Sequence, residues 1–448
     1  MSSLKDDFSP IVYEFPEMEE DIFKTKLNAK FSNNIDYPNF SLGFHHYIHQ
    51  SKDKMEITKD FEGKKKVYYV INKFEHQVDN YENSIKNKTE TFLKLNPSPL
   101  ILSRAFYKLW EMFFMFDLVP TDKDQFVSAH LAEGPGSFIQ ATMQYRDTYA
   151  TKLSSKDKFY AITLHSEEKH VPPMAKSFIN FYEKEKPQRF FQHKTHSKVK
   201  IGGSKTKTNG DLTDLRTIKI FGGAMKEKAH LVTADGGFNW KHENTQEQEA
   251  FRLIIGQIVG ALNVQEKGGS FVLKLFESFT DTTSKLIYIL SHFYKKVYGV
   301  KPLMSRKSNS EKYIICKGFK ASESRIKIME KLLDLAHKND KLNLISIFDE
   351  FMLPKKFKNT LIKMNTDIAN RQFQSINEMI TFINGQNYYG DEYQSRRKMQ
   401  IEANEYWNST FLIDSKNLPK ARLNVKEKRN KLIEENKERV KTISNVIV

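Results

Sequence analysis

The middle of the 448-residue chain alternates between two patterns of hydrophobic residues. Short runs of β-branched or aromatic residues, typical of buried strands, are followed by longer stretches in which apolar residues recur at helical spacing. This alternation is the signature of an α/β fold built around a sheet. The expected strands are 126–132, 159–164, 230–233, 270–276 and 313–316, and the expected helices are 103–116, 137–145, 245–262 and 282–298.

The pattern divides the chain into three parts. Residues 1–95 are expected to form an N-terminal extension of unknown role, which ends at the proline-containing stretch 96–99. Residues 96–320 hold the α/β pattern. Residues 321–448 are expected to form a helical, basic C-terminal extension, with helices at 323–337, 375–383 and 393–406.

The charge balance adds a possible polyanionic binding partner to this fold prediction. Lysine and arginine number 71 against 55 aspartates and glutamates, a formal net charge of +16. Such an excess favours a polyanionic partner because neutralised phosphates release condensed counterions, but it also keeps a large protein soluble, and charge alone does not separate the two. Residues 184–207 are expected to lie beside the sheet and contact RNA, and the lysine-rich tail from residue 415 is expected to be a solvated helix.

Cysteine usage and hydropathy limit the compartment. The single cysteine, Cys316, excludes a disulfide framework and a cysteine-based zinc site, and it is typical of a reducing compartment. We see neither the apolar core of a signal peptide nor a stretch long enough to span a bilayer. We therefore expect a soluble protein without membrane contact, in the cytoplasm (including a viral factory or virion), with the nucleus as the alternative.

The first candidate for chemistry is a glycine-rich loop that follows an expected strand and opens an expected helix. Glycines let a backbone approach a ligand closely, and the first turn of a helix offers unpaired N–H groups to an anion. A Gly-Pro-Gly stretch after a strand is often only a turn, so the loop alone is a weak signal. The candidate cofactor-binding residues here are Glu133, Gly134, Pro135, Gly136 and Phe138.

Four charged residues stand near the ends of expected elements. Asp235 follows a strand and precedes two glycines, which also fits a simple turn. Lys274 interrupts an apolar strand. A buried lysine must be paired with an acceptor, so a lysine without a specific role in the core does not explain this position well. Glu311 begins a short strand, and Lys108 lies on a helix where it would otherwise be a surface lysine.

Together, these residues and their surroundings carry a resemblance. Lys108, Asp235, Lys274 and Glu311, in that order around a glycine-rich loop, resemble the Lys-Asp-Lys-Glu tetrad of FtsJ/RrmJ-type ribose 2′-O-methyltransferases. The segments SRAFYKL, HLAEGPGSF, TADGGF, SFVLKLF and SNSEKYIICKGF are similar to that family's motifs, over about 100–320. The resemblance implies a Rossmann-like, seven-stranded, mostly parallel sheet and S-adenosylmethionine as the cofactor.

Within this family, the eukaryotic and viral mRNA cap enzymes are the most similar in pattern. Lys301-Pro302-Leu303-Met304-Ser305-Arg306, followed by Asn309-Ser310-Glu311, resembles their signature. The stretch 209–214 resembles the loop that holds the cofactor's adenine, which implies roles for Asp211 and Leu212. Leu164 closes another strand near the cofactor; no clear acid for the cofactor ribose follows it, and Glu167 is only a guess.

The resemblance also implies which residues meet RNA and do the chemistry. The candidates for substrate binding are Arg104, Trp240, Ser305, Arg306 and Asn309, and no metal is expected because His45, His46 and His49 lack the spacing of a metal site. Uncharged Lys274 would accept the proton of a ribose 2′-OH while the other tetrad residues orient it.

Alternatives to the capped 5′ end of mRNA remain. One is methylation of ribosomal or transfer RNA, and another is an inactive RNA-binding module on the same fold, because fold does not fix function. The extensions are also candidates for binding a protein partner. The oligomeric state is not readable from the sequence.

Overall fold

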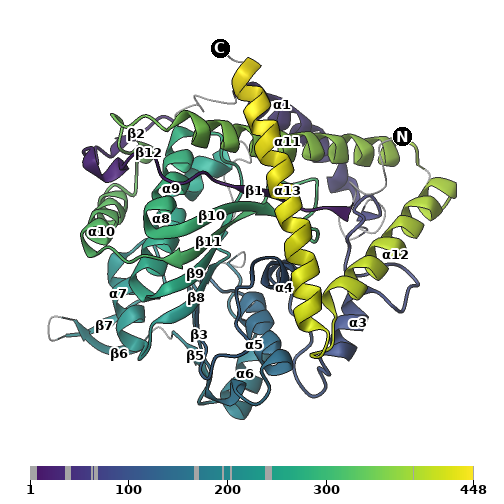
Figure 1. The fold of residues 1–448 in the computed structure, drawn as a ribbon, viewed down its shortest axis with the longest axis horizontal. Helices are drawn as coiled ribbons and strands as arrows, with labels where there is room; N and C mark the ends of the chain where they lie inside the picture. Colours follow the sequence, from purple (N-terminus) through teal and green to yellow (C-terminus); the bar gives the residue numbers. More distant parts are fainter. Residues whose placement is uncertain are drawn as a thin grey trace.

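The computed structural model describes residues 8–35, 42–61, 64, 69–165, 171–193, 196–201, 204–237, 245–386 and 388–446. In this part of the chain an eight-stranded sheet has the order β1-β10-β11-β9-β8-β3-β4-β5 (Figure 1). Strands β5, β4, β3, β8 and β9 pair in parallel, and β11, β10 and β1 continue the sheet antiparallel. The strands are β1 (Ile11–Glu14), β3 (Val127–Leu131), β4 (Lys158–Ile162), β5 (Phe190–Gln192), β8 (Ala229–Ala234), β9 (Gln265–Leu275), β10 (Tyr294–Lys301) and β11 (Lys312–Phe319).

Helices cover both faces of the sheet because alternate strand residues point to opposite sides. In β9, Phe271 and Leu273 join one hydrophobic core, whereas Val272 joins the other. The first core is completed by α7 (Leu215–Ala224), α8 (Gln246–Val264), α9 (Asp281–Phe293), α10 (Glu323–Lys338) and α11 (Lys355–Asn384). The second is completed by α4 (Ala105–Phe116), α5 (Ser137–Tyr149), α6 (Lys176–Glu185), α12 (Asp391–Phe411) and α13 (Leu418–Val446).

The remaining described elements lie around this sandwich. Two small antiparallel pairs, β2–β12 and β6–β7, sit outside the large sheet (Figure 1). Their bounds, with those of the two N-terminal helices, are β2 (Lys30–Ser32), β12 (Asn343–Ser346), β6 (His196–Ile201), β7 (Ser204–Lys207), α1 (Leu42–Asp53) and α3 (Ile85–Phe92). No helix among the described residues is long and apolar enough to cross a membrane.

The expected α/β class with a mostly parallel sheet is confirmed, but the sheet has eight strands rather than seven. The eighth is β1, which comes from the N-terminal extension and pairs with β10. The single helix expected over 282–298 was wrong at its end, because α9 stops at Phe293 and the chain enters β10 directly at Tyr294. The excursion over 184–207 also differs, since β5 within it is the edge strand of the sheet.

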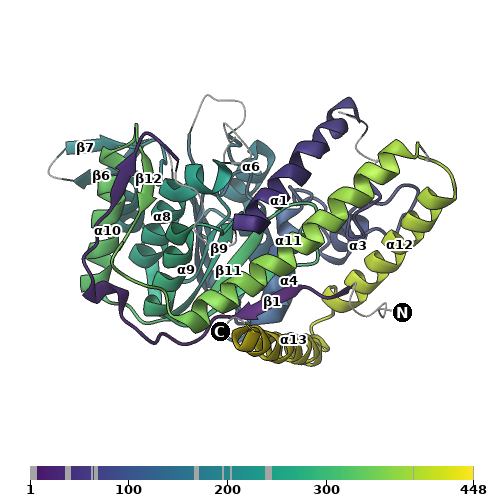
Figure 2. The ribbon, with the colours of Figure 1, turned by 90° about the horizontal axis from the view of Figure 1, so that it is seen from above.

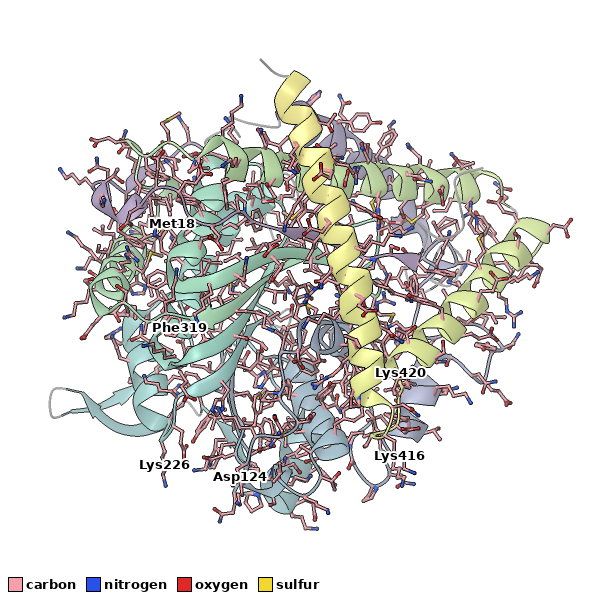
Figure 3. All side chains as sticks on the ribbon, in the orientation of Figure 1. Met18, Asp124, Lys226, Phe319, Lys416 and Lys420 are labelled. Carbon is pink, nitrogen blue, oxygen red and sulfur yellow. The ribbon has the colours of Figure 1, made fainter. Side chains whose placement is uncertain are left out.

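The basic tail is helical, as expected, but only partly solvated. Its helix, α13, runs across the molecule (Figures 1 and 2) and buries Val425 and Ile433 in the second core. Arg429 donates to the carbonyl of Met115 at the end of α4. Lys416 and Lys420, near the beginning of α13, remain exposed (Figure 3). The expectation of a freely solvated helix was therefore wrong for one of its faces.

Candidate active site

From β3 the chain continues to β4 and β5 on one side of the sheet, whereas the later strands β8 and β9 lie on the other side. The position between β3 and β8 is therefore a topological switch point. In open α/β sheets, ligands bind at such a point, at the carboxyl ends of the strands. A cavity of about 740 Å³ opens there. It brings together residues that the sequence places far apart. Among its lining residues are Gly134, Leu164, Asp211, Leu212, Asp235 and Lys274.

Two glycines let the walls of this cavity pack closely. A Cβ added to Gly134 would lie 1.8 Å from the carbonyl oxygen of Pro172. Gly210 has φ +81°, and a Cβ there would lie 2.0 Å from the carbonyl oxygen of Thr163. Both contacts are with backbone, which cannot move aside as a side chain does, so larger residues would displace the loops that form the cavity.

The glycine-rich loop differs in one respect from the sequence-based expectation. The buried carboxyl of Glu133 accepts the N–H of Ile139 at 2.8 Å and also that of Phe138, so these N–H groups at the start of α5 are already paired. Burial raises the pKa of Glu133 well above its usual value, and its Oε2 has no hydrogen-bond partner among the described residues. Gly136 lies at φ +113°, and the Pro135 carbonyl accepts the N–H of Ala175.

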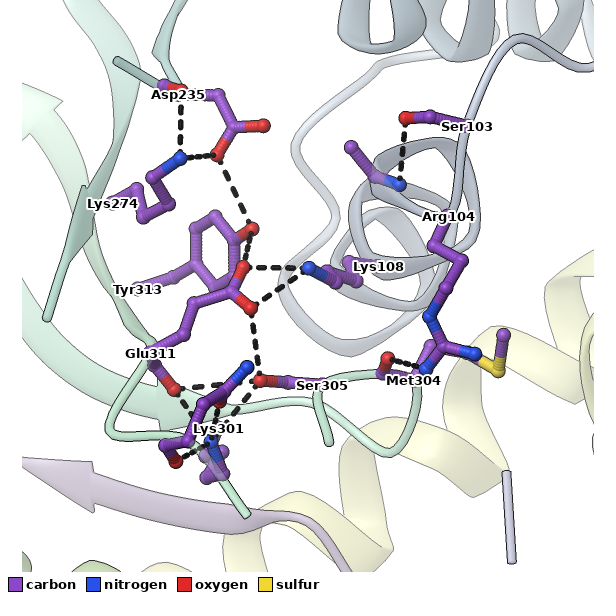
Figure 4. Close-up of polar contacts among 12 residues, drawn as sticks. Ser103, Arg104, Lys108, Asp235, Lys274, Lys301, Met304, Ser305, Glu311 and Tyr313 are labelled. Carbon is purple, nitrogen blue, oxygen red and sulfur yellow. Dashed lines mark hydrogen bonds and ion pairs between the residues drawn. The ribbon is translucent and has the colours of Figure 1, made fainter. Parts of the chain in front are cut away.

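The four charged residues meet beside this cavity as two ion pairs (Figure 4). Lys108 Nζ donates to both carboxylate oxygens of Glu311, at 2.7 and 2.8 Å. Lys274 Nζ donates to the main-chain oxygen of Asp235 at 2.8 Å and lies 3.1 Å from its Oδ1. Tyr313 joins the pairs, because its hydroxyl lies 2.5 Å from Glu311 Oε1 and 3.4 Å from Asp235 Oδ1.

Strand geometry explains this convergence. In the antiparallel pair of β11 and β9, Tyr313 is directly opposite Lys274, so both side chains share one face of the sheet. Glu311 precedes Tyr313 by two residues and therefore faces the same side. Asp235 follows the last residue of the neighbouring strand β8, and α4 lays Lys108 across this group.

The electrostatics fit a site in which the carboxylates stay charged. Burial would raise the pKa of Glu311, but the ammonium groups of Lys108 and Lys274 outweigh it and hold that pKa well below its usual range. Burial and the two carboxylates raise the pKa of Tyr313 well above its usual value. Its hydroxyl therefore keeps its proton and can donate to either acid.

Residues 101–319 match the model of the FtsJ-like methyltransferase family. These residues form an FtsJ-like methyltransferase domain. All four tetrad residues lie within it, as do the lining residues of the switch-point cavity from Ala132 to Phe276.

Several relatives of the chain carry names that refer to mRNA caps. "Cap-specific mRNA (nucleoside-2'-O-)-methyltransferase 1A" of Caenorhabditis briggsae is 28% identical over 64% of this chain and 32% of that protein. "Cap-specific mRNA (nucleoside-2'-O-)-methyltransferase 1" of Trypanosoma cruzi is 34% identical, over 36% of this chain and 46% of that protein. A 27% identical relative in C. briggsae is named "Inactive". The chain thus spans less than half the length of these relatives.

Within the FtsJ-like domain, the predicted RNA-contacting residues take different positions. Arg104 and Arg306 both pair with Glu75 of the N-terminal extension, and Arg104 also donates to the carbonyls of Phe74 and Met304. The guanidinium of Arg306 lies over the ring of Tyr69, 3.9 Å from its centroid. Asn309 faces Lys301, and Trp240 and Glu167 lie outside the described residues.

Both extensions help to form a second cavity, of about 460 Å³. Ser305 and Arg306 line it, whereas Arg104 and Asn309 are not among its lining residues. Its basic side chains are Lys73, Arg306, Lys307, Arg371 and Arg396. Glu378 and Glu392 also line it and pair with Arg396.

Three supporting residues were not among the candidates predicted from the sequence. Glu111 is the only charged residue between Leu109 and Phe116 of the apolar helix α4, a pattern that marks it as paired. It accepts the N–H groups of Leu303, Met304 and the Trp407 indole. Glu75 and Tyr313 gave no such signal, because their partners come from distant segments.

The histidines of α1 have other contacts. His49 lies 3.0 Å from the buried carboxylate of Glu277, which also pairs with Lys52. In the described part of the chain, no cluster of three or more His, Cys, Asp or Glu side chains is arranged to hold a metal ion.

Proposed function

We propose that the FtsJ-like domain transfers a methyl group from S-adenosylmethionine to a ribose 2′-OH of RNA, and that its substrate is the capped 5′ end of mRNA. The observation that carries this proposal is the position of Lys274. Its nitrogen lines the switch-point cavity and is held by Asp235, beside the Lys108–Glu311 pair.

The cavity suits a cofactor of this size. Its 740 Å³ lies within the range of about 300–1,000 Å³ for ligand sites. Asp211 on its wall accepts the N–H of Thr213 through Oδ1, which leaves Oδ2 as an acceptor for a polar group of the cofactor. When bound there, the cofactor supplies a sulfonium methyl group, which is already a strong electrophile.

The task left to the protein is to align the 2′-OH and take its proton. An uncharged lysine amine has two N–H bonds and one lone pair. Asp235 offers two acceptors to Lys274, its main-chain oxygen and Oδ1, so both N–H bonds can be held while the lone pair remains for the hydroxyl proton. Lys108, whose ammonium donates to both carboxylate oxygens of Glu311, lies beside this pair.

RNA as the substrate is supported by charge and by the second cavity. Five basic side chains line that cavity, two of whose lining residues, Ser305 and Arg306, lie in the loop before Glu311. Positive charge attracts a phosphate backbone without reading its sequence. The preference for a cap rests on the signature from Lys301 to Glu311 and on the names of the relatives.

The test is mass spectrometry of short RNAs after incubation with S-adenosylmethionine. The wild type should add one or more 2′-O-methyl groups to capped RNA, little to the uncapped RNA, and none to the matching DNA, which lacks the reactive hydroxyl. Lys274→Ala should abolish transfer while cofactor affinity changes only a few-fold. Lys267→Ala, in the exposed part of the same strand, is the matched control.

Three results would each contradict part of the proposal. Near wild-type transfer by Lys274→Ala would remove the assigned base. Salt-dependent RNA binding by the wild type without any methyl transfer would favour the alternative of an inactive RNA-binding module, and one relative is indeed named "Inactive". Equal or better transfer to uncapped structured RNA would favour the ribosomal or transfer RNA alternative.

A further inference from the structure

A buried lysine outside the tetrad closes the loop that carries Glu311. The chain leaves β10 at Lys301 and enters β11 at Lys312. The side chain of Lys301 turns back into the loop between them and is only 4% exposed. Its Nζ donates to the main-chain oxygens of Asn309 and Glu311, both at 2.8 Å, and contacts Asn309 Oδ1 at 2.9 Å and Ser305 Oγ at 3.1 Å (Figure 4).

Such an arrangement has a specific energetic meaning. A buried ammonium is costly unless each of its three N–H bonds finds an acceptor. Among the described residues, every acceptor of Lys301 belongs to its own loop, and two are main-chain carbonyls of the returning half. A different loop conformation would take these acceptors away from the buried side chain, so Lys301 and the loop conformation stabilise each other.

The loop connects directly to the tetrad. Ser305 Oγ, which accepts from Lys301, lies 3.3 Å from Glu311 Oε2. The main-chain oxygen of Glu311 is itself bound by Lys301, so this ammonium fixes Glu311 through its backbone and through Ser305. Glu311 in turn holds Lys108 through both carboxylate oxygens.

We propose that Lys301 is a positioning residue for methyl transfer: it locks the 302–310 loop so that Glu311 holds Lys108 beside Lys274. This inference rests on the proposed function. In this view the Lys-Pro-x-x-Ser-Arg segment, from Lys301 to Arg306, fixes the conformation of the loop in addition to any contact that it makes with RNA. Lys301 and Ser305 set the loop, and the neighbouring Arg306, which lines the second cavity, pairs with Glu75 and lies over the ring of Tyr69.

The first test replaces Lys301 with methionine, which keeps the length of the side chain but has no donor. Lys301→Met should lower kcat at least tenfold, while the KM for S-adenosylmethionine stays within twofold because Lys301 does not line the cofactor cavity. The matched control is Lys285→Met. Lys285 is equally buried and donates to the Phe348 carbonyl and to Asp281, away from the tetrad, so its loss should lower Tm without changing kcat.

The second test asks whether Lys301 acts through Glu311. If it does, the double variant Lys301→Met/Glu311→Gln should be about as slow as the slower single variant. A merely structural role would instead give a product of the two separate losses. Should Lys301→Met fail to fold, Ser305→Ala breaks the same connection without leaving a buried charge unpaired, and its loss of kcat should vanish in the Glu311→Gln background.

The outcomes separate this inference from the proposed function. Wild-type kcat in Lys301→Met, or fully multiplicative losses in the double variant, would overturn the positioning role while leaving a methyltransferase intact. Absence of methyl transfer by the wild type would overturn the proposed function itself.

Discussion

Among single residues, Glu111 is unusual because its carboxyl is both fully buried and an acceptor of several hydrogen bonds. Its carboxyl is fully buried in α4, where it accepts three N–H groups from the loop after β10 and from Trp407 of α12. Burial raises the pKa of Glu111 to about 7 despite these donors. The folded protein therefore keeps a proton on Glu111 at a pH at which the unfolded chain has lost it.

This difference predicts a pH dependence of stability. Between the unfolded pKa of 4.5 and the folded pKa of about 7, the folded state binds more protons, so the free energy of unfolding falls as pH rises. At about 1.4 kcal/mol per pKa unit the loss amounts to about 3 kcal/mol. Glu111→Gln cannot titrate, so urea unfolding of both proteins across this range should show the wild type losing that amount relative to the variant. A constant difference would contradict the shift.

The sequence was most informative for polar or charged residues that interrupt an apolar segment. Lys274 stands out because it interrupts an apolar strand, and it lies against Asp235 as expected. Glu75 does not stand out, since it lies in a polar stretch and its partners, Arg104 and Arg306, are supplied by tertiary packing. Local spacing therefore predicts which residues meet at the candidate site but not which residues hold them.

Among the elements, α13 combines charge with burial. Arg429 is one of many basic residues in the tail, yet it donates to the Met115 carbonyl and lies over the rings of Phe116 and Tyr298. Losing it would leave a buried carbonyl unpaired and remove contacts with two rings.

Arg429→Met should therefore lower the free energy of unfolding by about 2 kcal/mol. Lys431→Ala, two residues along the same helix but 80% exposed and only loosely paired with Glu435, should change it by less than about 0.5 kcal/mol. Thermal or urea unfolding of the two variants checks this. Equal effects would mean that α13 is held by its general charge rather than by its buried face.

The errors in the expected elements have physical causes. The helix expected over 282–298 has no glycine or proline near its true end, so the sequence gives no stop signal where α9 passes into β10 at Tyr294. β1 is only four residues long and owes its conformation to pairing with β10 rather than to its own pattern. Strand formation through distant pairing is what a single sequence reveals least.

At the scale of the whole molecule, the net charge of +16 predicts strongly salt-dependent RNA binding. Each phosphate contact with a single strand contributes about −0.7 to the slope of log K against log salt concentration. Lys73→Ala with Lys307→Ala, at the second cavity, should reduce the size of that slope by about 1. Lys327→Ala with Lys331→Ala, on the exposed side of α10, should leave it unchanged in the same titration.

The integration of the extensions predicts how a shortened chain behaves. Residues 96–320 contain the whole tetrad but lack β1, which extends the sheet, and α12 and α13, which cover α4. A fragment of these residues should therefore melt at a lower temperature than the full chain and lose methyl transfer. Circular dichroism melting with a parallel transfer assay checks this, and a fragment with full activity would show that the extensions serve RNA or partners only.

The pairing of β1 also has a consequence during translation. This strand leaves the ribosome long before β10, its neighbour in the sheet, and before α13, whose Asn436 donates to the otherwise open Val12 carbonyl. An unpaired strand edge is a template for pairing with other chains. The nascent polypeptide thus carries an unpaired strand edge until β10 and α13 have emerged, and chaperones have that whole interval in which to shield it.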